Sequence, residues 1–247
     1  MLNHDQAGLP ADFFRAWNQG LHPDLYEIEN RALDRAGHVW AALVRLAPWE
    51  GRILLDLGCG TGFWLPRYAE LAASVIGVEP DPELLAAARS RPGGASVLHG
   101  SAEHIPLPDN SVDVVHARFA YFFPSPQNDC SAGLAEVLRV LRPGGSLVVI
   151  DNDQNDGEFA DLLDAANAAA GQGDGGYIAA WWKERGASTT PVTSSWTFDR
   201  PEDLAGVLRM EFPDGTGAGW VARNPGRTRL SYGYALHHLS KGEPNRR

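Results

Sequence analysis

An aspartate stands two residues before a run of alternating glycines in the stretch ILLDLGCGTG, residues 53–62. Glycines at 58, 60 and 62 let the chain turn tightly and let its backbone approach a ligand closely. A carboxylate at the start of such a turn repels a pyrophosphate and suits an ammonium group or an N–H donor. We therefore expect Asp56 to lie beside a ligand with an amino group. The alternative is that Asp56 only ties the turn to helix amides.

A second acid, Glu79, ends the apolar stretch SVIGVE. An acid roughly 20 residues beyond a glycine turn commonly accepts hydrogen bonds from ribose hydroxyls, and Glu79 has that spacing. The alternative is that Glu79 only complements the dipole of the next helix. Asp81 is expected to cap that helix. The turn reads GxGxG and not GxGxxG, which argues against a nicotinamide-dependent oxidoreductase.

The segments around these acids alternate between apolar stretches and amphipathic stretches. We expect strands at 52–57, 74–79, 96–100, 112–120 and 146–151, and helices at 63–72, 80–91 and 132–141, the last of which RPGG ends. This rhythm is typical of a parallel sheet with helical crossovers.

The flanking regions are expected to be mainly helical. Residues 11–20 and 25–47 have helical punctuation, with Leu33, Ala36, Trp40, Leu43 and Leu46 on one helix face. Later helices are expected at 158–170, at 176–187 and after Asp199 as N-cap, and strands at 191–198 and 228–236.

Four motifs follow one another between about residue 53 and residue 151: DLGCGTG, VIGVEPD, GSAEHIPLPDNSVDVVHA and LRVLRPGGSLVVID. In this order they resemble a class I S-adenosylmethionine-dependent methyltransferase of the ubiquinone-biosynthesis-like group. The resemblance implies an α/β fold, a Rossmann-like seven-stranded, mostly parallel sheet with helices on both faces. It also implies an antiparallel last strand, an N-terminal helical cap, and S-adenosyl-L-methionine as the cofactor.

The resemblance also implies roles for individual residues. Asp56 would hold the glycine turn or the amino group of the cofactor, and Glu79 would hold the ribose hydroxyls. The other residues implied to contact the cofactor are Gly58, Cys59, Gly60 and Gly62 at the methionine part, Ser101, Ala102 and Glu103 at the adenine, Pro80 and Ile105 as apolar walls, and His116 and Ala117 near the sulfonium. Many relatives have Asp where this chain has Ser101, so Glu103 or the Ala102 amide is the expected partner of the adenine amine.

Methyl transfer from a sulfonium depends mainly on the alignment of the reacting atoms. An acceptor hydroxyl also has to lose a proton, for which His is the usual base. His116 is the first candidate base, and packing near the cofactor is its alternative role. Tyr26 is expected to cover the carboxylate end of the cofactor, with helix packing as the alternative. The expected acceptor contacts are Arg118, Tyr121, Phe122, Asp153 and Trp181. Trp181 and Trp182 are adjacent, so we expect that only one of them packs in the core.

Composition narrows the class of partner. The 247 residues carry a net charge of -10 without a basic cluster, which disfavours nucleic acid and anionic membranes as partners. No apolar run reaches membrane-spanning length, and the N-terminus reads as neither a leader nor a signal, so we expect a cytoplasmic protein. Cys59 and Cys130 are expected to be reduced thiols. No metal is expected, because DNDQND lacks the spacing of a calcium loop.

The sequence therefore predicts a methyltransferase that acts on a small, largely apolar molecule. Methylation of a protein or peptide side chain is one alternative, and a non-catalytic S-adenosylmethionine-binding subunit is another. The expected organisation is a helical cap at 1–48, a cofactor-binding core at 49–151, and a substrate-side insert with the final strands at 152–240. The oligomeric state is left open.

Overall fold

A computed structural model of the chain describes residues 9–170 and 176–243. Its helices are α1 (Trp17–Leu21), α2 (Pro23–Ala32), α3 (His38–Leu46), α4 (Leu65–Ala69), α5 (Pro82–Arg89), α6 (Ser131–Val140), α7 (Glu158–Ala170), α8 (Gly176–Glu184), α9 (Pro201–Glu211) and α10 (Thr216–Arg223). Its strands are β1 (Ile53–Leu57), β2 (Ser74–Glu79), β3 (Ser96–His99), β4 (Val112–Arg118), β5 (Leu141–Asn152), β6 (Ser188–Thr197) and β7 (Arg229–Ser240).

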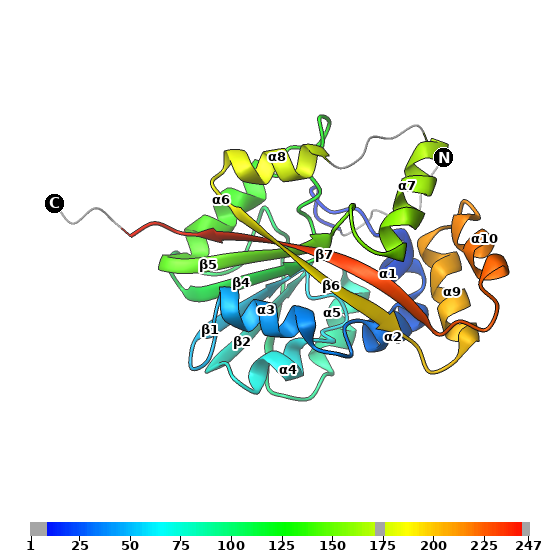
Figure 1. The fold of residues 1–247 in the computed structure, drawn as a ribbon. Coiled ribbons are helices and arrows are strands. Elements are labelled where there is room, and N and C mark those ends of the chain that lie inside the picture. Colours follow the sequence, from blue (N-terminus) through cyan, green and yellow to red (C-terminus); the bar gives the residue numbers. More distant parts are fainter. Residues whose placement is uncertain (1–8, 171–175, 244–247) are drawn as a thin grey trace. The chain divides into compact units, whose positions relative to one another are not determined.

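The strands form one seven-stranded sheet in the order β3-β2-β1-β4-β5-β7-β6 (Figure 1). Strands β1 to β5 pair in parallel. In contrast, β7 runs antiparallel to β5, because residue 144 bonds to residue 241 at one end while residue 153 bonds to residue 233 at the other. The leucines of β1 are almost completely buried, as expected for a parallel strand with both faces covered. The predicted fold class is confirmed.

The chain divides into two compact units. Among the described residues, the first unit comprises 9–15, 46–150 and 237–243, and the second comprises 16–45 and 151–236. The second unit therefore combines segments that the sequence analysis assigned to a separate cap and insert. Within it, Leu33 forms a bridge with Trp196 of β6.

The helix expected over 25–47 is interrupted between α2 and α3. Leu33 is extended, Asp34 has a φ of 49°, and the chain resumes a helix only at His38. One Asp34 oxygen accepts from the His38 amide and from the Ser194 hydroxyl, and the other accepts from the two amides that follow His38. The apolar spacing wrongly predicted one continuous helix, because the Asp34 carboxylate caps α3 and holds the chain against β6.

Two smaller expectations are also wrong. Strand β5 already begins at Leu141, because Gly144 pairs with Lys241, so RPGG lies within the strand. Asp199 does not cap α9: the N-cap is Arg200, and Asp199 is exposed and pairs with Arg35 at 2.7 Å. Helix α10 was not expected. Most of the GQGDGG segment, the first eight residues and the last four fall outside the described residues.

Within residues 9–170 and 176–243, no helix is long and apolar enough to cross a membrane. In the same ranges, no group of three or more His, Cys, Asp or Glu side chains is arranged to hold a metal ion. Cys59 and Cys130 are both free and buried.

Candidate functional site

The glycine turn after β1 depends on glycine both for its backbone and for its space. Gly58, Gly60 and Gly62 have φ angles of 72°, 56° and 71°, which side-chain-bearing residues rarely adopt. A Cβ added to Gly58 would lie 2.5 Å from the Cβ of Ala120. The turn therefore brings bare backbone against the loop that follows β4.

Glu79, at the end of β2, holds this turn. Its Oε2 accepts a hydrogen bond from the Gly60 amide and its Oε1 accepts one from the Asp81 amide, both at 2.8 Å. The side chain is buried, and burial raises the pKa of Glu79 to about 7 against the lowering effect of these two amides. A carboxylate has about four lone-pair sites, so each oxygen can still accept a further hydrogen bond.

Asp56 lies near the end of β1, beside Gly77 of β2 and His116 of β4. Its side chain is buried, and its carboxylate accepts no hydrogen bond from any residue in the described part of the chain. Burial raises the pKa of Asp56 to about 7, and the positive charge of Arg118 opposes that rise. Glu79 and not Asp56 thus ties the turn, and the Asp56 carboxylate is left for another donor.

Cys59, Pro80 and Ala117 line this edge of the sheet with buried groups. The Cys59 thiol packs against Gly77, where an added Cβ would lie 2.8 Å from Sγ. Burial, together with the nearby acids Asp56 and Glu79, raises the pKa of the thiol, so it stays protonated. These residues provide packing and add no ionised group.

The loop after β3 is a closed turn. The amide and carbonyl of Ser101 each bond to His104 at 3.3 Å, which places Ala102 and Glu103 at the tip. Ser101, Ala102 and Ile105 are buried, and the Ser101 hydroxyl has no partner among the described residues. The Glu103 amide donates to Oδ2 of Asp12 at 3.1 Å. Asp12 belongs to no recognisable motif, so the sequence analysis missed it.

The loop after β4 has an unusual backbone. Phe119 and Tyr121 have φ angles of 49° and 59°, and such conformations of aromatic residues persist only where the surroundings hold them. The Tyr121 hydroxyl donates to Glu103 at 2.9 Å and accepts from the Gly133 amide at 3.1 Å. Tyr121 therefore links the loops after β3 and β4, and its expected contact with the acceptor stays a prediction.

Two other predicted acceptor contacts flank Tyr121 in the same unit. Phe122 is buried and packs edge-on against Tyr121. The Arg118 guanidinium lies over the Trp64 ring, 4.8 Å from its centroid. Both residues keep their roles as predictions.

His116 is fully buried on β4. Its ring packs edge-on against Trp49 and Tyr68, with centroids 5.3 Å apart in each case, and Nδ1 lies 3.2 Å from the Tyr68 hydroxyl. Burial lowers the pKa of His116 to about 3. These observations support the packing role, and the role of base stays a prediction.

Three predicted site residues lie in the second unit. Tyr26 is buried on α2, and the Asp153 carboxylate accepts from the Asn155 amide at 2.9 Å in a local turn. Trp181 and Trp182 are both buried, with perpendicular rings, so the expectation that only one packs inside is wrong. Trp181 is buried because the Arg185 guanidinium stacks on its ring, with Cζ 3.6 Å from the ring centroid. Contacts of Tyr26, Asp153 and Trp181 with ligands remain predictions.

The second unit also buries several polar side chains. Asn18 donates to Glu211 at 2.8 Å, and Glu211 shares a hydrogen bond with Glu29, which is itself buried. Asn30 is only 3% exposed, and neither its amide nitrogen nor its oxygen has a partner among the described residues. Asp151, at the end of β5, is buried as well, which raises its pKa to about 6.

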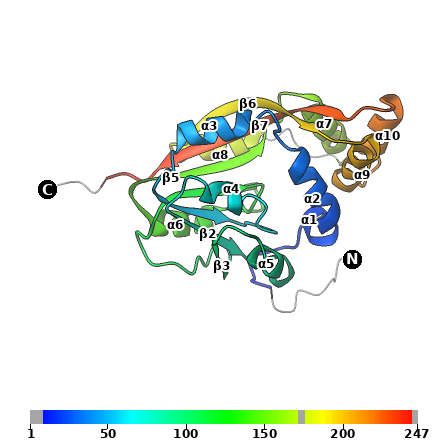
Figure 2. The ribbon, with the colours of Figure 1, turned by 90° about the horizontal axis from the view of Figure 1, so that it is seen from below.

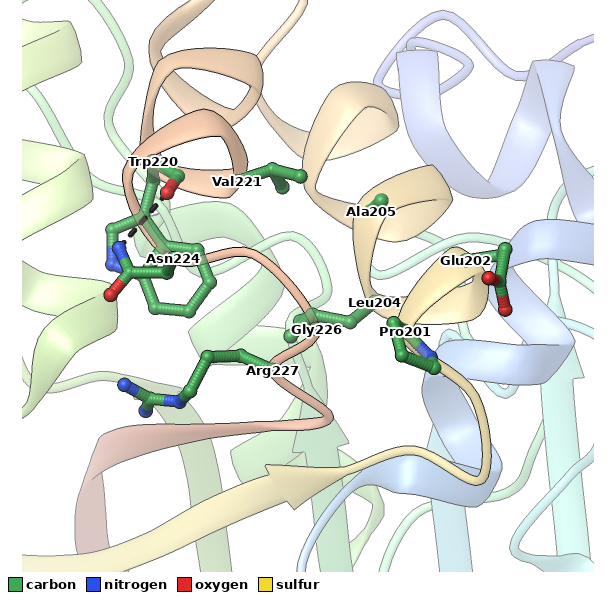
Figure 3. A pocket seen from close by; sticks show the side chains of 9 residues that line it. All are labelled: Pro201, Glu202, Leu204, Ala205, Trp220, Val221, Asn224, Gly226 and Arg227. Atoms are coloured by element: carbon green, nitrogen blue, oxygen red, sulfur yellow. Dashed lines mark hydrogen bonds between the residues drawn. The ribbon is translucent and has the colours of Figure 1, made fainter.

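A pocket of about 160 Å³ lies between α9 and α10 (Figure 3). Its charged Arg227 is already engaged, because it pairs with Glu158 at 3.0 Å and lies over the Trp220 ring. None of the predicted site residues lines it. We therefore assign it to packing between the two helices.

Comparison with known proteins agrees with this geometry. Residues 55–149 match the model of the methyltransferase domain family. An uncharacterized methyltransferase of Mycobacterium bovis is 40% identical over 111 residues, which cover 45% of this chain and 44% of that protein. A malonyl-[acyl-carrier protein] O-methyltransferase of Yersinia pestis is 33% identical over 172 residues, which cover 69% of this chain and 59% of that protein. The chain thus spans less than two thirds of either relative.

A solved structure shows the same fold. The YcgJ protein from Bacillus subtilis superposes with a TM-score of 0.59 at 17% identity, covering 84% of this chain and 99% of that one. The motifs between residues 53 and 151, the seven-stranded sheet and the family match agree with one another. The chain therefore contains a methyltransferase domain at residues 55–149, and its fold is that of the class I, S-adenosylmethionine-dependent methyltransferases.

Proposed function

We propose that this chain transfers the methyl group of S-adenosylmethionine to a small-molecule acceptor by in-line displacement. The observation that carries the proposal is the pair of buried acids, Asp56 and Glu79, at the ends of neighbouring strands beside the glycine turn. Two acids at this place disfavour a pyrophosphate and favour ammonium and hydroxyl donors. The amino-acid and ribose parts of S-adenosylmethionine carry those donors.

The described residues fit this cofactor. No described residue donates a hydrogen bond to the Asp56 carboxylate, which leaves it for the amino group, and Glu79 retains lone pairs for the ribose hydroxyls. The Ser101 hydroxyl, buried without a partner among the described residues, lies in the loop expected to meet the adenine.

When bound, the cofactor supplies a methyl group activated by its sulfonium. The protein contributes alignment, which can account for about 7–11 kcal/mol of a reaction barrier. The rigid turn, tied by Glu79, is proposed to hold the methionine part. Arg118 at the end of β4, and Tyr121 and Phe122 in the strained loop that follows, are proposed to contact the acceptor.

An acceptor that must lose a proton needs a base with a pKa near the working pH. Burial lowers the pKa of His116 to about 3, so its ring is a poor proton acceptor near neutrality. Asp151 follows Ile150, which pairs with Arg118 at the carboxyl ends of β5 and β4, and burial raises the pKa of Asp151 to about 6. We propose Asp151 as the base. We also propose that Asn30, whose buried amide has no partner in the described part of the chain, binds a polar group of the acceptor.

A second candidate acceptor is a carboxyl group carried on an acyl carrier protein. The match to the malonyl-[acyl-carrier protein] O-methyltransferase favours it, because that match extends over 172 residues, beyond the methyltransferase domain.

Transfer of labelled methyl groups separates these readings. The chain would be incubated with methyl-tritiated S-adenosylmethionine in two sets of reactions. One set contains a panel of small carboxylic acids and phenols, and the other contains malonyl-loaded acyl carrier protein. Label in a small, solvent-extractable product supports the proposal, whereas label found only on the carrier protein favours the second candidate. Binding of S-adenosylhomocysteine without transfer to any acceptor would favour a regulatory subunit.

A further inference from the structure

The segment at residues 9–15 belongs to the first unit and contacts residues that follow β2 and β3. In Figure 2 its dark-blue trace runs beside α5. The Arg15 guanidinium donates to both carboxylate oxygens of Asp81, the N-cap of α5, at 2.7 and 3.0 Å. Three residues earlier, Oδ2 of Asp12 accepts from the Glu103 amide at 3.1 Å. Two polar contacts therefore fix this segment against the loop expected to meet the adenine.

The second carboxylate oxygen of Asp12 takes no part in these contacts. Oδ1 is buried and has no hydrogen-bond partner among residues 9–170 and 176–243. The Ser101 hydroxyl, two residues before Glu103, is also buried without a partner among the described residues. Buried polar atoms without partners are rare in proteins because they are costly. Here two such atoms, Oδ1 of Asp12 and the Ser101 hydroxyl, belong to the two segments that the Glu103–Asp12 hydrogen bond joins. This pair indicates the place where a ligand donates a hydrogen bond.

Glu103, the other carboxylate near this loop, has no buried oxygen that lacks a partner among the described residues. Glu103, the partner expected from the sequence, accepts a hydrogen bond from the Tyr121 hydroxyl at 2.9 Å. Ser101 carries a hydroxyl, so the loop itself offers no buried carboxylate oxygen without a partner among the described residues. Asp12 brings one from a different part of the chain.

We infer that Asp12 accepts a hydrogen bond from the exocyclic amine of adenine and thereby selects the adenine base of the cofactor. The N6 amine is the hydrogen-bond donor of that edge of adenine, and a carboxylate can only accept. This inference rests on the proposed function, since it assumes that S-adenosylmethionine is the ligand.

Calorimetry with two ligands tests it. S-adenosyl-L-homocysteine carries the amine, and S-inosyl-L-homocysteine has a carbonyl oxygen in its place. In Asp12→Asn the side-chain oxygen can still accept from the Glu103 amide, while the new NH₂ group can donate to that carbonyl. The wild type should prefer the adenosyl ligand, and Asp12→Asn should lower this preference by about ten- to a hundredfold.

Glu83→Gln is the matched control, because Glu83 is 78% exposed and lies 4.0 Å from Arg15. This variant removes a charge beside the same segment without touching the loop, and it should keep the wild-type preference. Asp12→Asn combined with Ser101→Asp returns a carboxylate to the loop and should restore the preference for the adenosyl ligand. Thermal unfolding without ligand checks that each variant folds.

Equal weakening of both ligands in Asp12→Asn would show that Asp12 only holds the segment, and would overturn the inference. An unchanged preference would overturn it as well. Both results presuppose that the wild type binds S-adenosyl-L-homocysteine. If it does not, the proposed function itself fails, so the two failures can be told apart.

Discussion

Glu79 accepts a 2.8 Å hydrogen bond from the backbone amide of Gly60, so an acid on β2 holds the glycine turn that follows β1. The side chain expected to bind the ribose thus fixes the shape of the turn before any ligand arrives. Preorganisation of this kind reduces the ordering cost of binding.

Gly58→Ala should abolish cofactor binding. The added Cβ would lie 2.5 Å from the Cβ of Ala120, at a φ of 72°, so both a clash and a backbone penalty arise. We expect a loss of about 2–4 kcal/mol in the free energy of unfolding, measured by urea denaturation.

Gly94→Ala is the control for Gly58→Ala. Gly94 has a nearly identical φ of 73° but no atom within 4 Å of an added Cβ, so only the backbone penalty remains. The loss should be about 1 kcal/mol, with affinity for S-adenosylhomocysteine retained. Equal losses of stability in the two variants would contradict the steric account of the turn.

Asp56→Asn should change how stability depends on pH. The pKa of Asp56 rises from 3.8 to about 7 in the folded chain, so the folded state binds this proton more tightly than the unfolded state. The stabilisation is complete below the unfolded pKa and is lost as pH rises through about 7. The free energy of unfolding of the wild type relative to Asp56→Asn should therefore fall by up to about 4 kcal/mol between about pH 4 and pH 8.

Urea denaturation of both ligand-free proteins across that pH range measures the difference. The titration of His116 is common to both proteins and cancels. Glu79 also has a pKa of about 7, but the charge of Asp56 is the smallest of the effects that raise it, so its titration nearly cancels as well. A difference that does not vary with pH would show that Asp56 is not desolvated in the folded chain.

Replacing His116 should affect stability more than chemistry. The ring is fully buried against Trp49 and Tyr68, so His116→Ala should lower the free energy of unfolding by about 3 kcal/mol. Because the pKa of His116 is about 3, the pH profile of kcat for the milder His116→Gln should keep its acidic limb. Asp151→Asn should remove that limb. If a folded His116→Gln lost the acidic limb of its kcat profile, His116 and not Asp151 would be the base.

Asn30→Leu should separate stability from activity. Its amide is buried without a partner in the described part of the chain, so an apolar side chain of similar size should raise the free energy of unfolding by about 1 kcal/mol. The KM for the acceptor should rise, while the affinity for S-adenosylhomocysteine stays unchanged. Asn18→Leu is the counterpart: Asn18 donates to Glu211, so this change should destabilise by about 1–3 kcal/mol. A destabilised Asn30→Leu with normal kinetics would refute the acceptor role.

The sequence predicts the first unit well because its signals are local. Apolar stretches gave β1 to β4, and Asp81 caps α5 through the Glu83 amide, as expected. The break between α2 and α3 was missed because Asp34 gains its partner Ser194 from β6, far along the chain.

The site was predictable only where its residues sit in motifs. Asp56 and Glu79 stand out by their distance from the glycines, but Asp12 has no motif around it. Its contact with the Glu103 amide joins residues 91 positions apart, which no local spacing reveals. The engagement of the Tyr121 hydroxyl with two loops depends in the same way on the folded backbone.

The most direct test of the central claim is calorimetric titration of the wild type and Glu79→Ala with S-adenosyl-L-homocysteine and with NAD. We predict one-to-one binding of S-adenosyl-L-homocysteine to the wild type, no competing binding of NAD, and affinity lower by about ten- to a hundredfold in Glu79→Ala. Glu83→Gln, on the exposed side of α5, should bind like the wild type. Preference of the wild type for NAD, or unchanged affinity in a folded Glu79→Ala, would contradict the account.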